Sequence, residues 1–367
     1  MKQRVHLMQR FPRTVLRRVC LLGLVLATGC ERDHVLDVKT GEAAFLGFEV
    51  ESAAAGELAS GTVFFADASN RDHPRIVEVN RAGEVVWQYR VPPELVLATS
   101  LMDVAPTPGG GALFVVDGVG AFEVDAEGEL VHAFESIQPS HDIDLLDDGS
   151  WLLTNGWARM GEPHFMIVTP EGETTWEWLG LDQYGMLPYT DIYREGWMHA
   201  NAAQRQPDGS LLVSLRNFYR VVMLDPAGDP VWEIQFDEID PDAYDAGEYD
   251  VVEGRNPHEP ELTPDGTVLV ALHRPSQVVE VDVETQEVVW RWSPPDDDGA
   301  TIRDANRLSN GNTLVTAAHA IFELSPDGAV LWKLRSNVDR SEADVSGSVR
   351  SFYKAVLIDD DGEVYGG

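Results

Sequence analysis

Short apolar runs separated by glycine-containing turns fill the chain from about residue 62 onward. The pattern is clearest between residues 141 and 178, where the turns Asp148-Gly149 and Glu171-Gly172 each separate two apolar runs. An Asp-Gly turn between apolar runs indicates a β-hairpin, because glycine adopts positive φ at no steric cost. This stretch therefore predicts four short antiparallel strands.

The second turn of this unit and the strand after it recur six times as a Gly-x-x-x-Trp motif. The copies are Gly83 to Trp87, Gly128 to His132, Gly172 to Trp176, Gly228 to Trp232, Gln286 to Trp290 and Gly328 to Trp332. A period of about 40–60 residues indicates one supersecondary unit that is repeated and stacked. Four strands per unit and no helical period predict an all-β fold, a six-bladed β-propeller of four-stranded antiparallel blades.

The C-terminal residues supply a further half unit. Residues 353–358 and the turn Asp361-Gly362 have the form of a first strand with its turn, whereas blade one begins at Thr62 without such a strand. We expect the C-terminal strand to complete blade one, because closing the ring removes exposed strand edges.

The N-terminus has the features of a secretory signal. Basic residues precede a short apolar run at residues 19–27, and Ala27-Thr28-Gly29-Cys30 follows. The run is too short to span a membrane, and a cysteine after glycine resembles the lipobox of bacterial lipoproteins. We expect a signal peptide at 1–29, lipidation at Cys30, a tether at 30–45 and a single propeller domain at 46–367; an ordinary cleaved signal is the alternative.

The net charge indicates which partners the surface repels. The formal net charge is −35, and removal of the leader, with its six basic and no acidic residues, lowers it to about −41. Such a surface repels nucleic acid and anionic lipid headgroups, so we expect membrane contact only through the anchor. Glu31 after the cysteine fits the periplasmic face of an outer membrane.

Cys20 and Cys30 are the only cysteines, so no disulfide is expected in the mature fold.

Basic and imidazole side chains recur at one register of the predicted inner strands. The position eight residues before each first-turn glycine is occupied in blades three to six and in the closing strand by His141, Asn201, His258, Arg303 and Lys354, with His199 two residues before Asn201. The ends of the second strands add Arg216, His273, Arg274 and His319. Because inner strands line the channel of a propeller, we expect these side chains to converge at its mouth.

This set of residues predicts an anion-binding site with nucleophilic or acid–base chemistry. Arginine and histidine donate strong hydrogen bonds to anions, and histidine titrates near neutral pH. With no cysteine in the mature fold and no His-x-x-x-His helix, we expect no standard zinc site and no cofactor, and a metal bound by three converging histidines is the alternative. The alternative is that each histidine caps a strand or bonds a neighbouring blade. His132 occupies a tryptophan position, which favours packing.

Two long insertions leave alternatives open. Residues 181–197 are rich in aromatic residues and form either a lid or a packed surface loop. Residues 236–255 are rich in acidic residues and form either a calcium loop or a solvated loop, although no EF-hand spacing is present.

Three stretches of this register resemble the bacterial arylsulfate sulfotransferases, a six-bladed propeller family. They are His141-Asp142 before Leu146-Asp147-Asp148-Gly149, Met198-His199-Ala200-Asn201 with Ser214-Leu215-Arg216-Asn217, and Pro257-His258 before Pro264-Asp265-Gly266. We expect no counterpart of the N-terminal β-sandwich of well-known members. The resemblance implies ping-pong transfer of a sulfuryl group from an aryl sulfate to a phenol.

The same resemblance implies a role for each residue of the catalytic set. His258 becomes transiently sulfated, and His141, His199 and Arg216 hold the sulfuryl oxygens. The remaining polar residues of the register, Asn201, His273, Arg274, Arg303, His319 and Lys354, are expected to bind substrate.

Two other functions compete with this prediction. A non-catalytic lipoprotein, acting as an envelope scaffold or binding protein, needs only the repeats and the anchor. A quinone-dependent dehydrogenase fits less well, because such propellers usually have eight blades.

Overall fold

A computed structural model of the chain describes residues 47–52, 57–70, 74–92, 95, 101–192, 195–237, 255–295, 301–336 and 352–366. All of them belong to one compact unit that begins at Leu46. The predicted signal peptide, Cys30 and tether lie outside the described residues, as does most of the acidic insertion at 236–255. In the described part of the chain, no helix is long and apolar enough to cross a membrane.

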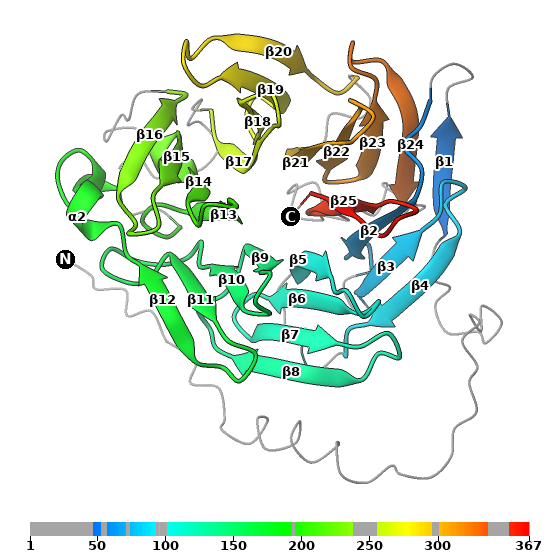
Figure 1. The fold of residues 1–367 in the computed structure, drawn as a ribbon, viewed down its shortest axis with the longest axis horizontal. Coiled ribbons are helices and arrows are strands. Elements are labelled where there is room, and N and C mark those ends of the chain that lie inside the picture. Colours follow the sequence, from blue (N-terminus) through cyan, green and yellow to red (C-terminus); the bar gives the residue numbers. More distant parts are fainter. Residues whose placement is uncertain are drawn as a thin grey trace, which may run out of the picture. The chain divides into compact units, whose positions relative to one another are not determined.

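Six antiparallel sheets are arranged around one central axis, as Figure 1 shows, and this confirms the predicted six-bladed propeller. Blades two to five each have four strands in chain order. They are β5 (Leu101–Pro106), β6 (Ala112–Val116), β7 (Gly120–Val124) and β8 (Leu130–Glu135) in blade two; β9 (Asp142–Leu145), β10 (Trp151–Thr154), β11 (Phe165–Val168) and β12 (Thr174–Trp178) in blade three; β13 (Ala200–Arg205), β14 (Leu211–Leu215), β15 (Arg220–Leu224) and β16 (Pro230–Gln235) in blade four; and β17 (Pro257–Leu262), β18 (Thr267–Leu272), β19 (Gln277–Asp282) and β20 (Val288–Trp292) in blade five.

Blades one and six each contain a fifth strand, which the sequence pattern did not predict. Blade one has the order β26 (Val364–Tyr365), β25 (Ala355–Ile358), β2 (Thr62–Asp67), β3 (Arg75–Val79) and β4 (Val85–Arg90). Blade six consists of β21 (Ile302–Arg307), β22 (Thr313–Ala317), β23 (Ala320–Leu324) and β24 (Val330–Ser336), with β1 (Phe48–Ser52) added at its outer edge.

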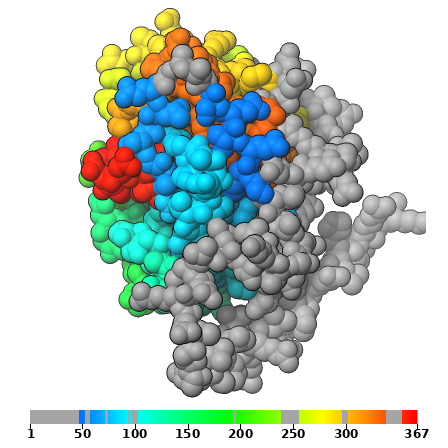
Figure 2. Space-filling model, turned by 90° about the vertical axis from the view of Figure 1, so that its right-hand side faces the viewer, coloured from blue at the N-terminus to red at the C-terminus, as the bar shows by residue number. Residues whose placement is uncertain are grey.

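The ring closes where the two ends of the described chain meet. Strand β25 pairs antiparallel with β2, Ile358 opposite Thr62 and Ala355 opposite Phe65, so the predicted closure by the C-terminal strand is confirmed. Strand β1 covers the outer edge of β24. Figure 2 looks at this edge and shows the blue start of the described chain beside the orange blade six and the red C-terminal strand.

Among the described residues, the hydrophobic core consists of six clusters, each between two neighbouring blades. Between blades three and four, for example, Leu152 and Phe165 pack with Val213 and Phe218. The other five clusters lie between the remaining pairs of neighbours. Since burying one large apolar side chain contributes about 1.5–3 kcal/mol, every blade depends on both of its neighbours for stability.

The Gly-x-x-x-Trp motif joins adjacent blades. The indoles of Trp87 and Trp332 donate to backbone carbonyls in the matching turn of the next blade, at Ala126 (3.0 Å) and Arg81 (2.9 Å). The turn requires positive φ, and Gln286 adopts φ 59° where glycine is replaced. His132 packs edge-to-face on Trp151 of blade three, as its position in the motif suggested.

The aromatic insertion contains the short helix α2 (Leu181–Tyr184) and the 3-10 helix η1 (Tyr189–Asp191), although no helical period was evident in the sequence. Tyr184 and Trp197 are buried in the cluster between blades three and four, and Tyr189 packs on Phe218. These contacts support the packed-loop alternative for this insertion. Tyr193 lies outside the described residues.

Candidate active site

The predicted basic register lies at the start of the inner strands. His141 and His199 directly precede β9 and β13, His258 is the second residue of β17, and Arg303 is the second residue of β21. All four are buried, with 2–4% of each residue exposed. Because these strands are neighbours around the axis, their first residues come together at one end of the channel.

Ring contacts connect these residues into one cluster. The imidazoles of His141 and His199 lie 4.9 Å apart, centroid to centroid, and His258 lies 5.4 Å from His273. Tyr353 connects the two pairs, because its ring centroid lies 6.4 Å from both His141 and His258. The Arg303 guanidinium lies 5.2 Å from the centre of the same phenol ring. We call His141, His199, His258 and Arg216 the histidine cluster.

Arg216 belongs to this cluster through His199. It begins the 3-10 helix η2 (Arg216–Phe218), and its Nη1 lies 3.0 Å from His199 Nε2. His199 Nδ1 lies 2.6 Å from the Glu195 carbonyl, which assigns the ring proton to Nδ1 and leaves Nε2 as an acceptor. Burial, reinforced by Arg216 and His141, holds the pKa of His199 well below its ordinary value. This imidazole is therefore neutral near pH 7.

A hydroxyl and a glycine position His141. Ser140 Oγ lies 2.7 Å from His141 Nδ1 and accepts the amide proton of Gly156 at 2.9 Å. A side chain at position 156 would not fit, since a Cβ there would lie 2.2 Å from His141 Nδ1 and 2.7 Å from the Ala200 carbonyl. Gly156 thus provides the space for this imidazole.

His258 differs from the other two histidines of the cluster. Neither of its ring nitrogens has a hydrogen-bond partner among the described residues. Burial lowers the pKa of His258 well below its ordinary value, and the nearby His273, Arg303 and Arg216 add to the shift. A buried polar nitrogen without a partner costs about 1–3 kcal/mol, a cost that a bound substrate can offset. The ring is neutral at pH 7 and carries a lone pair.

Irregular backbone surrounds the cluster. The inner strands β13, β17 and β21 each carry a bulge, at Asn201, Glu259 and Arg303 respectively. His199 (φ 48°) and Glu259 (φ 30°) adopt left-handed conformations, each of which costs about 1–3 kcal/mol for a non-glycine residue. Bulges re-aim side chains and are frequent next to active sites. The Asn201 amide also donates to the Pro257 carbonyl at 3.0 Å, which fixes the residue before His258.

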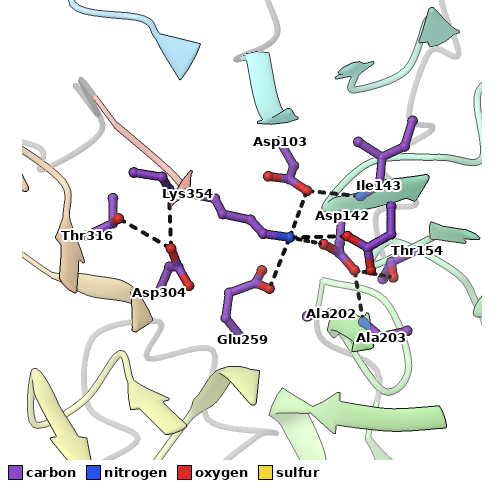
Figure 3. A network of polar contacts seen from close by, with 12 residues as sticks. Asp103, Asp142, Ile143, Thr154, Ala202, Ala203, Glu259, Asp304, Thr316 and Lys354 are labelled. Atoms are coloured by element: carbon purple, nitrogen blue, oxygen red, sulfur yellow. Dashed lines mark hydrogen bonds and ion pairs between the residues drawn. The ribbon is translucent and has the colours of Figure 1, made fainter. Parts of the chain in front are cut away.

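The channel next to the histidine cluster is occupied by acidic side chains around one lysine (Figure 3). Lys354 Nζ lies 3.0 Å from Asp142, 3.3 Å from Asp103, 3.5 Å from Asp144 and 3.7 Å from Glu259. We call these five residues the carboxylate cluster. It joins residues of blades one, two, three and five. Four of its members, Asp142, Asp144, Glu259 and Lys354, line a cavity of about 10 Å³, room for about one water.

Charge is unevenly balanced in the carboxylate cluster, since four carboxyl groups surround one ammonium. Burial raises the pKa of Asp103 and Glu259 well above their ordinary values, and it raises that of Asp144 to about 7 although Lys354 opposes the shift. Burial also disfavours the charged form of Lys354, but the carboxylates outweigh this and hold its pKa well above the usual range. Asp304 lies nearby, accepts from the Ala355 amide at 3.2 Å, and has its pKa raised to about 6 by burial.

The structure therefore divides the predicted site residues into groups. His141, His199, Arg216, His258, His273 and Arg303 come together, and Asn201 orders the strand beside them. Lys354 has four carboxylate partners, so its ammonium group is paired within the carboxylate cluster. Arg274 and His319 are half-buried in the loops after β18 and β22, where their predicted substrate contact stays a prediction. Among the described residues, no group of histidine, aspartate or glutamate side chains is arranged to hold a metal ion.

Sequence reasoning missed Tyr353, Trp157 and the carboxylate cluster. Tyr353 adjoins Lys354, and Trp157 lies eight residues after the turn glycine of blade three, as His319 does in blade six. The position seven residues before the first-turn glycine is acidic in four of the six blades, at Asp103, Asp142, Glu259 and Asp304. The repeat therefore contained a second signal, one residue away from the basic register.

Together, these features define a six-bladed propeller with imidazoles and guanidiniums gathered at one end of its channel. The family model of the arylsulfotransferases (ASST) matches residues 48–235, about half of the chain, including His141, His199 and Arg216. The chain belongs to this family. No curated protein matches it.

Solved structures share the fold at low sequence identity. A protein of unknown function from Bacteroides caccae has 18% identity and a TM-score of 0.53, with 80% of this chain and 97% of that chain covered. A streptogramin B lyase has 12% identity and a TM-score of 0.51, with 89% and 96% covered. At these identities the likeness concerns the fold alone.

Proposed function

We propose that this protein transfers a sulfuryl group from an aryl sulfate to a phenol through a sulfohistidine at His258. The observation that carries the proposal is a buried, neutral imidazole, next to His199, His273 and Arg303, whose two ring nitrogens have no hydrogen-bond partner in the described part of the chain. Membership of the arylsulfotransferase family supports the class of substrate.

In the first half of the reaction, a ring nitrogen of His258 attacks the sulfur. The new N–S bond forms as the S–O bond to the aryl group breaks, and the phenolate leaves with the electron pair of that bond. The proton on the other ring nitrogen of His258 ends on the phenol oxygen, and the neighbouring imidazoles of the cluster can relay it. The products are a neutral phenol and an N-sulfo imidazole that carries the sulfonate charge.

In the second half, the phenolic acceptor reverses these steps. Its oxygen attacks the sulfur, the N–S bond breaks, and the acceptor proton returns to the imidazole of His258. The enzyme therefore needs no nucleotide sulfate donor, in keeping with the ping-pong scheme.

Arg216 and the other cations supply the electrostatic part of catalysis. The sulfuryl oxygens carry negative charge throughout the transfer, and fixed donors in a buried site stabilise it strongly. Arg216, held against His199 and Glu195, has 16% of its side chain exposed, and Arg303 is 3% exposed. Their charges therefore act in a site from which most water is excluded.

The sequence supports an envelope location for this activity. We propose that Cys30 carries a lipid and that the propeller faces the periplasm from the outer membrane. Detergent-phase partitioning of the full chain against Cys30→Ser tests this: the variant should move to the aqueous phase, and equal partitioning would overturn the proposal.

The activity is tested by nitrophenol release from 4-nitrophenyl sulfate in the presence of phenol. We expect His258→Ala to reduce the rate by on the order of 10⁴-fold or more, as removal of a nucleophile does. His164→Leu is the matched control, because His164 is also a buried histidine with no partner for either ring nitrogen among the described residues. Absence of release, or release that His258→Ala leaves unchanged, would overturn the proposed function.

A further inference from the structure

We propose that Trp157 is the platform that binds the aryl ring of the substrate and so selects aryl over alkyl sulfates. This inference rests on the proposed function. Trp157 is 38% exposed, whereas the two histidines that it touches, His141 and His199, are 3% and 4% exposed. It is therefore the open aromatic side of an otherwise buried cluster.

The indole is in contact with both histidines. Its ring centroid lies 4.7 Å from that of His141 and 4.9 Å from that of His199, with interplanar angles of 69° and 82°. The two histidines lie 4.9 Å from each other, so the three rings form a triangle of mutual edge-to-face contacts. The indole is thus the exposed ring of this triangle.

Several hydrogen bonds fix the position of Trp157. Its Nε1 donates to Asp117 of blade two at 3.0 Å. The preceding residue, Gly156, donates to Ser140, and the following residue, Ala158, accepts from the Trp197 amide at 2.8 Å. An aromatic side chain that is held before the ligand arrives loses little entropy on binding.

The chemistry of an aryl sulfate requires such a surface. In this ester the aryl carbon is only two bonds from the sulfur, so a sulfuryl group held by the histidine cluster leaves the aryl ring at the cluster's edge. Aromatic rings attract each other at centroid distances of about 4.5–7 Å, with about 0.5–1.5 kcal/mol beyond area burial. An alkyl sulfate presents the same anion without this contact.

Dead-end sulfonates test the platform without turnover, because they lack the ester oxygen. We would measure the binding of 4-nitrobenzenesulfonate and methanesulfonate by calorimetry to the mature protein and to Trp157→Leu, Trp157→Phe and Trp176→Ala. The last variant changes a tryptophan of the outer strand β12. Thermal unfolding of each variant shows whether it is folded.

We expect Trp157→Leu to weaken the binding of 4-nitrobenzenesulfonate about tenfold, while the affinity for methanesulfonate changes less than about twofold. Trp157→Phe should keep most of the affinity that Trp157→Leu loses. Trp176→Ala should change neither. Equal weakening of both sulfonates, or a phenylalanine variant as weak as leucine, would overturn the platform and leave the proposed function standing. A folded wild-type protein that binds neither sulfonate and releases no nitrophenol would overturn both.

Discussion

The histidine cluster and the carboxylate cluster are adjacent in one channel, yet they differ in the polar groups that they gather and in how their central residues are paired. In the carboxylate cluster, Lys354 has four carboxyl partners, and Asp142 also accepts from the Ala203 amide at 2.8 Å. In the histidine cluster, neither ring nitrogen of His258 has a hydrogen-bond partner among the residues described, and His199 has a left-handed backbone. The first arrangement joins blades, and the second leaves the imidazole of His258 available for the role proposed above.

The two clusters come from neighbouring positions of the same repeat. His258 and Glu259 are consecutive, as are His141 and Asp142, and Arg303 and Asp304. The strand alternation and the bulges send one side chain to the mouth and the next into the channel. The comparison predicts that changes in the carboxylate cluster act on stability and changes in the histidine cluster act on catalysis.

Lys354→Met should produce the largest loss of stability, because it leaves four buried carboxyl groups without their cation. Breaking a buried ion pair from one side costs about 3–5 kcal/mol. Buried carboxyl groups with a raised pKa favour the protonated form. Their contribution to the free energy of unfolding is therefore present at low pH and is lost as pH rises. Urea unfolding should therefore show that Lys354→Met lowers the free energy of unfolding, relative to the wild type, by more at pH 8 than at pH 5.

Asp103→Asn is the matched variant, because the amide copies the protonated form that the raised pKa of Asp103 favours. We expect it to lower the free energy of unfolding by less than half as much as Lys354→Met does. A Lys354→Met protein as stable as the wild type at pH 8 would contradict the structural role of the cluster.

Arg216→Ala should reduce kcat by about 10²–10³-fold, the typical effect of removing one donor to a developing anion. Because Arg216 helps to lower the pKa of His199, the same change should raise that pKa, which histidine NMR signals would report. Arg220→Ala is the control: Arg220 lies in the same blade and pairs with Glu233. Equal losses of kcat in the two variants would show that Arg216 has no specific role in the reaction.

Gly156→Ala should reduce kcat by about 10²-fold, because displacement of a positioned group by about 1 Å has an effect of this size. The added Cβ would push against His141 Nδ1, which lies 2.2 Å from its position. Gly109→Ala is the control, since a Cβ there meets nothing within 4 Å. Steady-state rates of the two folded variants check this, and an unchanged rate in Gly156→Ala would contradict the role given to His141.

His164→Leu should have the smallest effect on catalysis, within about twofold. Burial lowers the pKa of His164 to about 3 in the folded state, against an ordinary value of 6.5. Its neutral form therefore stabilises the fold above about pH 6.5, and this stability is lost as pH falls toward 3. The acid side of the stability profile should become shallower in the variant; an unchanged profile would show that His164 does not titrate on unfolding.

The sequence predicted the fold well because the determinants of a propeller are local and repeated. Turn glycines set the hairpins, and two tryptophans of the motif, Trp87 and Trp332, anchor their outer strands on the next blade. Strand β1 could not be predicted, because Phe48–Ser52 carries no copy of the motif and pairs with residues almost 300 positions away.

The site was predicted less completely, since its details depend on bulges and loops. The basic register brought His141, His258 and Arg303 to the same place, but it assigned Lys354 to the substrate. Counting along the basic register alone did not reveal Asp103, Asp142 and Glu259, which lie one position away in the repeat and surround the Lys354 ammonium group. Trp157 lies in the loop after β10 and Tyr353 lies two residues before the closing strand β25, so strand alternation does not predict where their side chains point.

The central claim is that His258 carries the sulfuryl group between donor and acceptor. Mass spectrometry after incubation with 4-nitrophenyl sulfate alone tests it most directly. We expect a protein heavier by one SO₃ group, with the modification mapped to His258, and its loss on addition of phenol. An unmodified protein under conditions of turnover, or a sulfuryl group on another residue, would contradict it.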